Sequence, residues 1–437
     1  MIRRPFRPLQ LLDVDADHLP GPVTAALDPG GRPYARAQLL VFRGGRPSGI
    51  SRVDFVDGQL SEPVLEVIVS AVAPDNCLLP PLPVPTAGPP ATVLVASRGR
   101  PASLLRCLRS LRHLEYRPFD VVVVDNGDRA DLAWEVVDEV AGPDFEVTYV
   151  HEPIPGLSTA HNAGLRAAST EIVAITDDDV EVDRGWLGAL VEQFVAHPDA
   201  AAVTGLIYPA ALDYPAQARA ESTNLGKGLE LRRFDLGSHR PDDPRFPIAV
   251  GMCGSGANMA FRRTVLEQIG GFDLALGAGS PSAGGDDLAA LHDVLRLGYA
   301  VIYQPAAVVR HHHDPDPAAL ERQALTYGRG LGAYLTRCAV RDPAGFAAIV
   351  GRSLLGWRRG TRQESGPSAI DGLVRGHRLR QLRGLVSGPL GYVAGRRRAA
   401  AIAPHVGAGA PAGRTAIGAT HPAPALVDDR GSRLASG

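Results

Sequence analysis

The chain has 437 residues, of which 45% are hydrophobic and 21% are charged, and its net charge is −2. These values are typical of a soluble globular protein with two or three domains, and the balanced charge gives no basic field that would recruit nucleic acid. No run of about 18 apolar residues predicts a membrane-spanning helix, and no apolar stretch follows the basic N-terminus as in a secretory signal. The four cysteines lie far apart without a Cys-x-x-Cys pair, so neither a zinc site nor a disulfide framework is indicated, and a reduced, cytoplasmic setting is expected.

Composition and pattern divide the chain into five parts. Residues 1–77 contain short alternating apolar stretches separated by glycine-rich turns, which predicts a small β-rich module. Residues 78–90 are a proline-rich linker, and residues 91–330 alternate between strand and helix patterns. Residues 331–398 are basic and helical in character, and residues 399–437, rich in Ala, Gly, Pro and polar residues, are expected to be disordered.

The central part of the chain predicts an α/β fold. Short apolar runs at residues 91–96, 119–124, 145–150 and 171–175 are typical of buried strands, and leucines at helical spacing fill residues 101–113 between the first two. This alternation predicts a Rossmann-like, mostly parallel sheet with helices on both faces. In such sheets, ligands bind beyond the carboxyl ends of the strands.

An acidic triplet, Asp177, Asp178 and Asp179, follows the strand predicted at residues 171–175. Carboxylates packed so closely repel one another, and one would normally stay protonated. A hard divalent cation relieves this repulsion, and Mg²⁺ typically binds through one or two carboxylates together with substrate phosphates. The triplet therefore indicates a metal-bridged phosphate, although on its own it is equally compatible with an acidic loop that caps the next helix.

Other polar residues also fall where predicted strands end. Ser97 and Arg98 follow the first strand of the central part, and Asp125 follows the second. Because the carboxyl ends of parallel strands meet at one edge, these groups are expected beside the acidic triplet, which favours the nucleotide site over the capping loop. Asp125 is also placed to form an Asx turn with Gly127.

Across residues 91–315, the order of these motifs resembles the family 2 glycosyltransferases, which have the GT-A fold. The resemblance implies that a nucleotide-sugar donor is bound with Mn²⁺ or Mg²⁺. It assigns the nucleotide base to Asp125, the ribose to Asp177 and the metal to Asp179, with Asp177 as a further ligand. It also places Ser97, Arg98 and Asp178 at the nucleotide.

Two later motifs extend the resemblance. The small-residue segment 251–263 is similar to the one that crosses beneath the donor sugar, which implies that Asn258 contacts the donor, and small residues there allow close backbone approach. Asp286 and Asp287 stand where the family has Gly-Glu-Asp at the start of a helix. The resemblance makes Asp287 the catalytic base, with Asp286 in place of the usual Glu. A helix N-terminus that simply favours Asp is compatible with the same residues.

Histidines occupy two positions of interest. His161 stands where the family often has Arg, and since a neutral imidazole would neutralise less diphosphate charge, a structural role is at least as compatible. The strand predicted at residues 307–310 runs into His311, His312 and His313. The resemblance implies that a His after this strand completes the metal or diphosphate site. We choose His311, with His313 second, because alternation puts those two on one face. An exposed polar loop is the alternative.

The reaction implied is transfer of the sugar to an acceptor hydroxyl with inversion, because a single base is expected and no second carboxylate is placed as a nucleophile. Two alternatives stay open. A nucleotidyltransferase would share the sheet, the nucleotide and the metal, and residues 97–101 partly match its phosphate loop. A binding protein with a catalytically dead site would keep only the fold.

Arginine and leucine alternate between residues 352 and 398, which leaves two interpretations open. The stretch is compatible with an amphipathic element on an anionic membrane, and hence with peripheral membrane association and a lipid-linked acceptor. It is also compatible with helices packed on the catalytic domain, with arginine stems covering apolar surface. A glycan or a small molecule is then the alternative acceptor.

Overall fold

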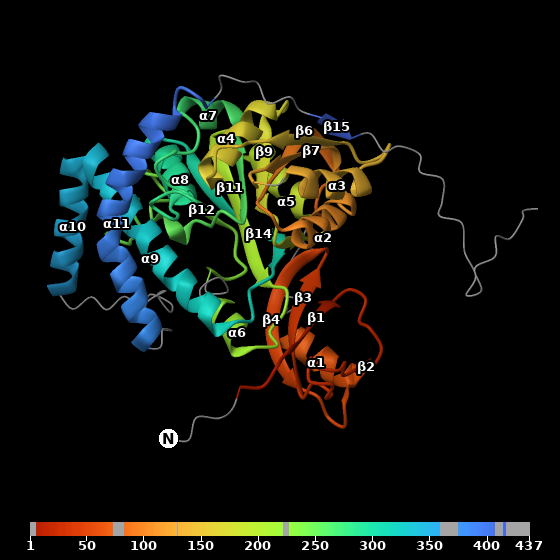
Figure 1. The fold of residues 1–437 in the computed structure, drawn as a ribbon. Coiled ribbons are helices and arrows are strands. Elements are labelled where there is room, and N and C mark those ends of the chain that lie inside the picture. The colour runs from red at the N-terminus through yellow and green to blue at the C-terminus, as the bar shows by residue number, and fades with distance from the viewer. Residues whose placement is uncertain are drawn as a thin grey trace, which may run out of the picture.

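The computed structural model describes residues 6–72, 83–128, 130–221, 227–358, 375–406 and 414–416. A small N-terminal module lies against one end of a larger α/β domain, and three long helices, α9, α10 and α11, cover one side of that domain (Figure 1).

A ten-stranded sheet forms the centre of the described α/β domain. Its order is β10-β14-β11-β13-β9-β6-β7-β8-β15, and β12 pairs with β14 outside this path. Strands β9, β6, β7 and β8 pair in parallel, as do β11 and β14, whereas β13 runs antiparallel between the two groups. The bounds are β6 (Ala87–Ser97), β7 (Arg117–Asp125), β8 (Val147–His151), β9 (Ile172–Asp177), β10 (Val180–Val182), β11 (Ala200–Pro209), β12 (Arg232–Phe234), β13 (Asn258–Arg262), β14 (Ala300–His311) and β15 (Arg414–Ala416).

Helices cover both faces of this sheet, which confirms the predicted α/β class. Val93 and Val95 of β6 pack into the core beneath α2, α3 and α5, whereas Leu94 points to the opposite face with α4, α7 and α8. Successive side chains of a strand alternate in this way between the two faces, so a strand covered on both sides is apolar throughout. The bounds are α2 (Pro101–Arg112), α3 (Ala130–Val140), α4 (Leu157–Ala167), α5 (Trp186–Ala196), α6 (Pro215–Glu221), α7 (Arg263–Gln268), α8 (Asp286–Arg296), α9 (Pro317–Arg341), α10 (Pro343–Arg358) and α11 (Arg375–Ile402).

The N-terminal module is rich in strands, as expected, and braces the central sheet. One side of its sheet packs on α1 through a small core of its own. On the other side, Leu40 packs with Leu206, Tyr208 and Val308 of β11 and β14, and Gln38 Nε2 donates a hydrogen bond to the Tyr208 hydroxyl at 3.0 Å. Its elements are β1 (Gln10–Asp15), β2 (Val23–Thr24), β3 (Arg36–Arg43), β4 (Arg46–Asp54), β5 (Gln59–Leu60) and α1 (Glu62–Val72).

The boundaries between parts differ from those expected. Strand β6 begins at Ala87, inside the predicted linker 78–90, of which residues 78–82 lie outside the described part. The prolines are accommodated because the pairing of β6 with β7 is irregular between Ala87 and Ala91, and the Tyr116 hydroxyl donates to the carbonyl of Pro89. The expected boundary at residue 330 falls inside α9, which continues without a break to Arg341.

The C-terminal tail, predicted to be disordered over residues 399–437, is described only in part. Its first residues continue α11 as far as Ile402, and Arg414–Ala416 forms β15 against β8. Residues 407–413 and 417–437 lie outside the described part of the chain.

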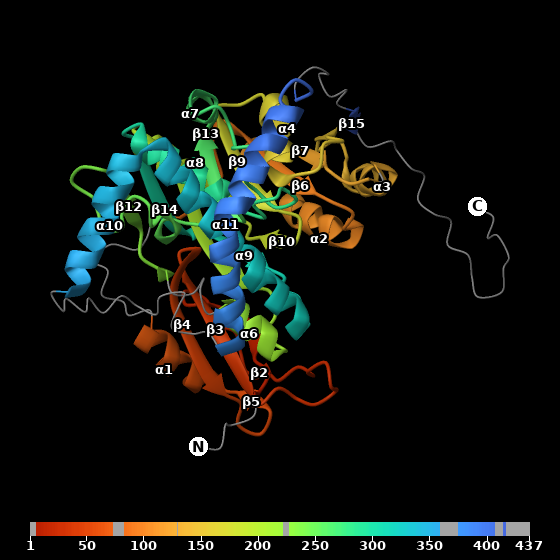
Figure 2. The ribbon, with the colours of Figure 1, turned by 60° about the vertical axis from the view of Figure 1, so that its left-hand side comes forward.

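Helices α9 and α11 pack closely along their length (Figure 2). A Cβ atom at Gly328 would lie 2.1 Å from the carbonyl oxygen of Gln381, and one at Gly384 would lie 2.2 Å from that of Leu325. Glycine at both positions therefore permits the backbones to approach. Among the helices of the described residues, none combines the length and apolar character needed to cross a bilayer.

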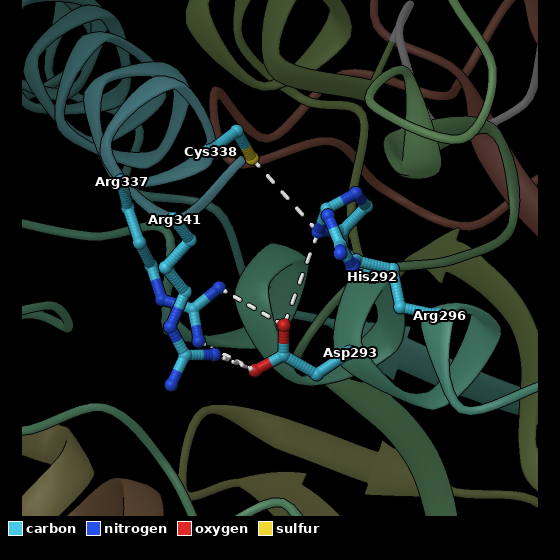
Figure 3. Close-up of a pocket in the computed structure, with 6 residues that line it drawn as sticks. All are labelled: His292, Asp293, Arg296, Arg337, Cys338 and Arg341. Carbon is cyan, nitrogen blue, oxygen red and sulfur yellow. Dashed lines mark hydrogen bonds and ion pairs between the residues drawn. The ribbon is translucent and has the colours of Figure 1, made fainter. Parts of the chain in front are cut away.

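A buried arginine fastens α9 to the rest of the domain (Figure 3). Arg337 is 3% exposed, and it donates to Asp273 at 2.7 Å and to Asp293 of α8 at 3.1 Å. Arg341 pairs with the same Asp293 at 2.7 Å. The hollow around these groups is also lined by His292, Arg296 and Cys338. The carboxylate of Asp293 faces the guanidinium groups of Arg337 and Arg341, and Arg337 also pairs with Asp273. The charges of this cluster therefore balance within it, and the cluster joins α8 to α9.

We expect Asp293→Ala to lower the free energy of unfolding by about 3–5 kcal/mol, because it leaves the buried cation of Arg337 with Asp273 alone. The pair Arg109–Glu139, in which both side chains are more than half exposed, provides the control. Glu139→Ala should cost about 1 kcal/mol or less. Urea denaturation of both variants measures the difference, and equal losses would contradict a stabilising role for the cluster.

Candidate active site

The acidic triplet lies in a tight turn between two strands of the central sheet. Asp177 ends β9, and Val180 begins β10. Strand β10 pairs antiparallel with β14, so that Val180 lies opposite His311. The backbone N–H of His312 also donates to the carbonyl of Asp179 at 2.9 Å. The pairing therefore brings the predicted histidine to the acidic turn, although more than 130 positions separate them in sequence.

Asp178 points into the protein and is neutralised there. Its carboxylate is fully buried and accepts hydrogen bonds from the Ser97 hydroxyl at 2.6 Å and from Arg100 Nε at 3.2 Å. Burial raises the pKa of Asp178, and the neighbouring Arg100 cation opposes that rise. Ser97 and Asp178, two of the residues predicted to contact a nucleotide, are thus hydrogen-bonded to each other.

Asp179 faces two cations. Its Oδ2 accepts a hydrogen bond from Arg100 Nη1 at 2.7 Å, and its Oδ1 lies 3.3 Å from His311 Nε2. Burial tends to raise the pKa of Asp179, but His311 and Arg100 outweigh it and hold the pKa well below its ordinary value. For His311, burial tends to lower the pKa, and Asp179 raises it overall. The two groups therefore form an ion pair.

Asp177 differs from its neighbours in protonation. Burial, and then the charge of Asp179, raise the pKa of Asp177 to about 7. Since the charge of His311 also acts on this carboxyl, Asp177, Asp179 and His311 lie close together. The three carboxylates are thus not equivalent: one is neutralised internally, one is ionised and one sits near the point of half-protonation.

The predicted metal site was tested against these contacts. Among the described residues, no three His, Cys, Asp or Glu side chains are arranged to hold a metal ion by themselves. However, Asp179 Oδ1 is buried without a hydrogen-bond donor, and an imidazole nitrogen lies 3.3 Å from it. An oxygen and a nitrogen ligand fit an ion such as Mn²⁺, and Mg²⁺ commonly keeps several water or phosphate ligands. Asp179 and His311 therefore fit two ligands of a divalent cation.

Asp287 lies at the N-terminus of α8, where the chain turns through Gly285 at φ 86°. Its two oxygens accept hydrogen bonds from the backbone N–H groups of Gly256, at 2.9 Å, and of Leu288, at 2.8 Å. A carboxylate can accept about four hydrogen bonds, so acceptor capacity remains. Burial and the charge of Asp286 raise the pKa of Asp287, as a base that works near neutral pH requires.

Asp286 lies beside His161. Its Oδ2 lies 3.6 Å from His161 Nδ1, which is too long for a hydrogen bond, and both side chains are almost fully buried. The imidazole packs on the Phe272 ring, with 4.7 Å between ring centroids. Both ring nitrogens of His161 and Oδ2 of Asp286 are buried without a hydrogen-bond partner in the described part of the chain.

Asp125 and Arg98 lie at the same sheet edge but differ in exposure. Asp125 is buried, accepts the backbone N–H of Gly127 at 2.9 Å in the expected Asx turn, and accepts the Tyr149 hydroxyl at 3.0 Å. The backbone N–H of Asn126 donates to the carbonyl of Ser97, which ties the ends of β6 and β7 together. Arg98 is exposed beside this edge.

Asn258 is the predicted donor contact that the structure places elsewhere. It is fully buried in β13, where its Oδ1 accepts the Trp186 indole N–H at 2.9 Å. Its Nδ2 donates to the carbonyls of Leu206, at 3.0 Å, and Ala307, at 2.8 Å. Its side-chain polar groups are therefore used inside the domain, and Asn258 is corrected from a donor contact to a residue that holds β11, β13 and β14 together.

The sequence reasoning missed two residues at the site. The sequence analysis considered Arg100 only as part of a phosphate loop. Its position three residues after the end of the strand could have suggested an ion pair with the acidic residues 177–179. Tyr327 of α9 is 61% exposed, its hydroxyl accepts a hydrogen bond from Gln323 Nε2 at 2.9 Å, and the charges of Asp177 and Asp287 act on it. Burial of the hydroxyl and the charges of Asp177 and Asp287 raise its pKa to about 12. No local pattern in the sequence marks this tyrosine.

Comparison with known proteins identifies the domain. Residues 92–270 match the model of glycosyl transferase family 2. This part of the chain is similar to the domains of glycosyl transferase family 2. The match covers β6 to α7, including the acidic turn, so the resemblance drawn from the sequence motifs is confirmed there, and the α/β sheet agrees with the expected GT-A architecture.

Several relatives are glycosyltransferases. The chain is 29% identical to the pre-mycofactocin glycosyltransferase of Mycobacterium tuberculosis, over 63% of this chain and 54% of the relative. The chain thus spans about half the length of that relative. The glucosyl-dolichyl phosphate glucuronosyltransferase of Haloferax volcanii is 26% identical over 50% of this chain and 67% of its own. A mannosyltransferase of Pyrobaculum calidifontis, solved with GDP-Man and Mn²⁺, is 20% identical, with a TM-score of 0.45, over 71% of this chain and 86% of its own.

The ion pair of His311 and Asp179 predicts a pH-dependent stability of the protein. The raised pKa of His311 gives a contribution that is complete below about pH 6.5 and is lost as the pH rises through the folded-state pKa. The lowered pKa of Asp179 gives a contribution that is present above about pH 4 and is lost as the pH falls through its folded-state pKa. The pair therefore stabilises most between about pH 4 and 6.5.

In EDTA, His311→Gln should lower the free energy of unfolding by about 1 kcal/mol at pH 5.5 and by less at pH 9. Denaturant titration at both pH values measures this. The exposed pair of His18 and Asp15 provides the control, because His18→Gln should change little at either pH. A larger loss at pH 9 than at pH 5.5 would contradict the assigned charges.

Proposed function

We propose that the protein is a glycosyltransferase that moves a sugar from a nucleotide-diphosphate donor to an acceptor hydroxyl, with inversion at the anomeric carbon. The observation that carries the proposal is the ion pair of Asp179 and His311 at the edge of a sheet, in which Asp179 belongs to the segment 92–270 that matches glycosyl transferase family 2. Open α/β sheets bind ligands at that edge, and a diphosphate needs positive charge there.

Asp287 is our candidate for the catalytic base. It would accept the proton of the attacking hydroxyl, and its raised pKa supports this role because a base works best when its pKa approaches the ambient pH. The hydrogen bonds from Gly256 and Leu288 fix the orientation of the carboxylate. Asp286, the other carboxylate proposed at this position, would act by keeping the pKa of Asp287 high.

On the donor side, Asp179 and His311 would hold Mn²⁺ or Mg²⁺, with Asp177 as a further ligand. When bound, such an ion neutralises charge on the leaving diphosphate. Arg98 is exposed at the same edge and would contact the phosphates, while Asp125 would accept a hydrogen bond from the nucleotide base. The carboxyl of Asp177 is the one group of the acidic turn whose pKa, about 7, would fall on ligand binding, because a cation favours its ionised form.

The acceptor is proposed only as a hydroxyl compound. The relatives are named for different compounds, pre-mycofactocin and glucosyl-dolichyl phosphate, so they support sugar transfer without selecting one acceptor class. We also propose a reduced, cytoplasmic setting, supported by the three buried free thiols of the described residues, Cys107, Cys253 and Cys338. We further propose that the protein associates peripherally with a membrane.

The product released from the donor tests the reaction. Incubation with a panel of nucleotide sugars and either Mn²⁺ or Mg²⁺ should release a nucleoside diphosphate from one of them, slowly by hydrolysis and faster with an acceptor mixture. Release of a sugar 1-phosphate would instead indicate transfer of the nucleotidyl group, as a nucleotidyltransferase would catalyse. Donor binding without release of either product would indicate a binding protein with a dead site.

Asp287→Asn should lower kcat by about 10²–10⁴-fold and leave donor binding nearly unchanged, because it removes the proton acceptor but keeps the shape of the side chain. Glu62→Gln, at the exposed start of α1, is the matched control and should keep full activity. Melting temperatures of both variants check the fold. An Asp287→Asn protein that folds and retains its kcat would rule this residue out as the base.

A further inference from the structure

Helix α11 presents two chemically distinct faces. Gly384, Gly388 and Gly395 lie on the packed face, where an added Cβ atom would come within 2.2–2.4 Å of the backbone of α9 or of the loop at Ala275. The opposite face carries five exposed apolar residues. They are Leu379 (57% exposed), Leu382 (55%), Val386 (79%), Leu390 (75%) and Val393 (49%).

These five residues form one continuous stripe. They are spaced by three or four positions, so they line up along a single side of the helix. At 1.5 Å per residue, the stripe is about 21 Å long. In both ribbon views α11 runs along the outside of the α/β domain (Figures 1 and 2). A stripe of this length on a surface helix is a contact surface and not part of the core.

The charge of α11 has a single sign. Residues 375–402 contain seven arginines and no aspartate or glutamate. Arg380 pairs with Glu321 of α9 at 2.8 Å, and Arg398 donates to the carbonyl of Pro155. Arg383 lies at the edge of the stripe, four positions after Leu379, and is exposed, as are Arg396 and Arg397 at its C-terminal end. Exposed cations therefore border an apolar stripe.

We propose that this face of α11 docks on the surface of an anionic membrane. The stripe would enter the boundary between headgroups and acyl chains, and the bordering arginines would reach lipid phosphates. A second copy of the chain fits less well, because two such faces would bring arginines of like charge together without an acidic partner. This proposal identifies the surface through which the protein would associate with a membrane. It rests on the exposed face of α11 and does not require that the protein transfers a sugar.

Vesicle flotation with the full-length chain tests the proposal. The probes are vesicles of phosphatidylcholine with about 30% phosphatidylglycerol, and vesicles of phosphatidylcholine alone. We expect binding to the anionic vesicles that weakens at high salt, because exposed charges are then screened. The double variant Val386→Asp, Leu390→Asp should bind at least tenfold less, and each of Arg383→Glu and Arg397→Glu about fivefold less.

Val67→Asp is the matched control, because Val67 is a 71% exposed valine on α1, far from α11 in the chain. It should bind as the wild type does. All substitutions are at exposed positions, so melting temperatures should stay unchanged and separate lost docking from lost folding. Nucleotide binding should also be unchanged, so the two proposals fail or succeed separately.

Three outcomes would overturn the proposal. The first is a wild-type chain that fails to float with anionic vesicles at low salt. The second is equal binding by the wild type and the Val386→Asp, Leu390→Asp variant. The third is concentration-dependent dimerisation in light scattering that this variant abolishes, without vesicle binding, which would make a second copy the partner of the stripe.

Discussion

The pairing of Arg100 with the buried Asp178 is the interaction on which the arrangement of the site depends. A buried carboxylate needs a partner, and Arg100 supplies it from the start of α2 while Ser97 supplies a hydroxyl from the end of β6. With Asp178 fixed inward, the turn presents Asp179 toward His311 on the far strand. The same arginine also reaches Asp179, so it supplies positive charge at the carboxylate where a metal ion would otherwise do so.

The sequence was sufficient for the features that depend on local pattern. Continuous apolar runs such as Val121–Val124 predicted strands buried on both faces, and the position of polar residues at strand ends located the site edge. Contacts between residues far apart in the sequence could not be predicted from such a local pattern. Arg100 and Asp178 are 78 positions apart, and Asn258 finds Trp186 at a separation of 72. The donor role expected for Asn258 failed because its buried amide is needed inside the sheet.

The C-terminal helices bear on two interpretations that the sequence left open. Arginine and leucine repeats left open whether this region packs on the domain or lies on a membrane. In the structure, glycines bring one face of α11 against α9, while leucines and valines remain exposed on the other. Packing therefore fixes the rotation of the helix, and that rotation decides which residues face outward. The position of the glycines, not the hydrophobic pattern alone, carries this information.

The central claim, that the acidic turn binds a nucleotide diphosphate with a metal ion, is tested most directly by thermal melting. The chain would be melted with a panel of nucleoside diphosphates in Mn²⁺, Mg²⁺ or EDTA. One nucleotide should raise the melting temperature with metal, since a ligand at 100 times its Kd stabilises by about 2.7 kcal/mol. That shift should vanish in EDTA and in Asp179→Ala, but persist in the exposed control Asp144→Ala. No shift with any nucleotide, or an unchanged shift in Asp179→Ala, would contradict the account.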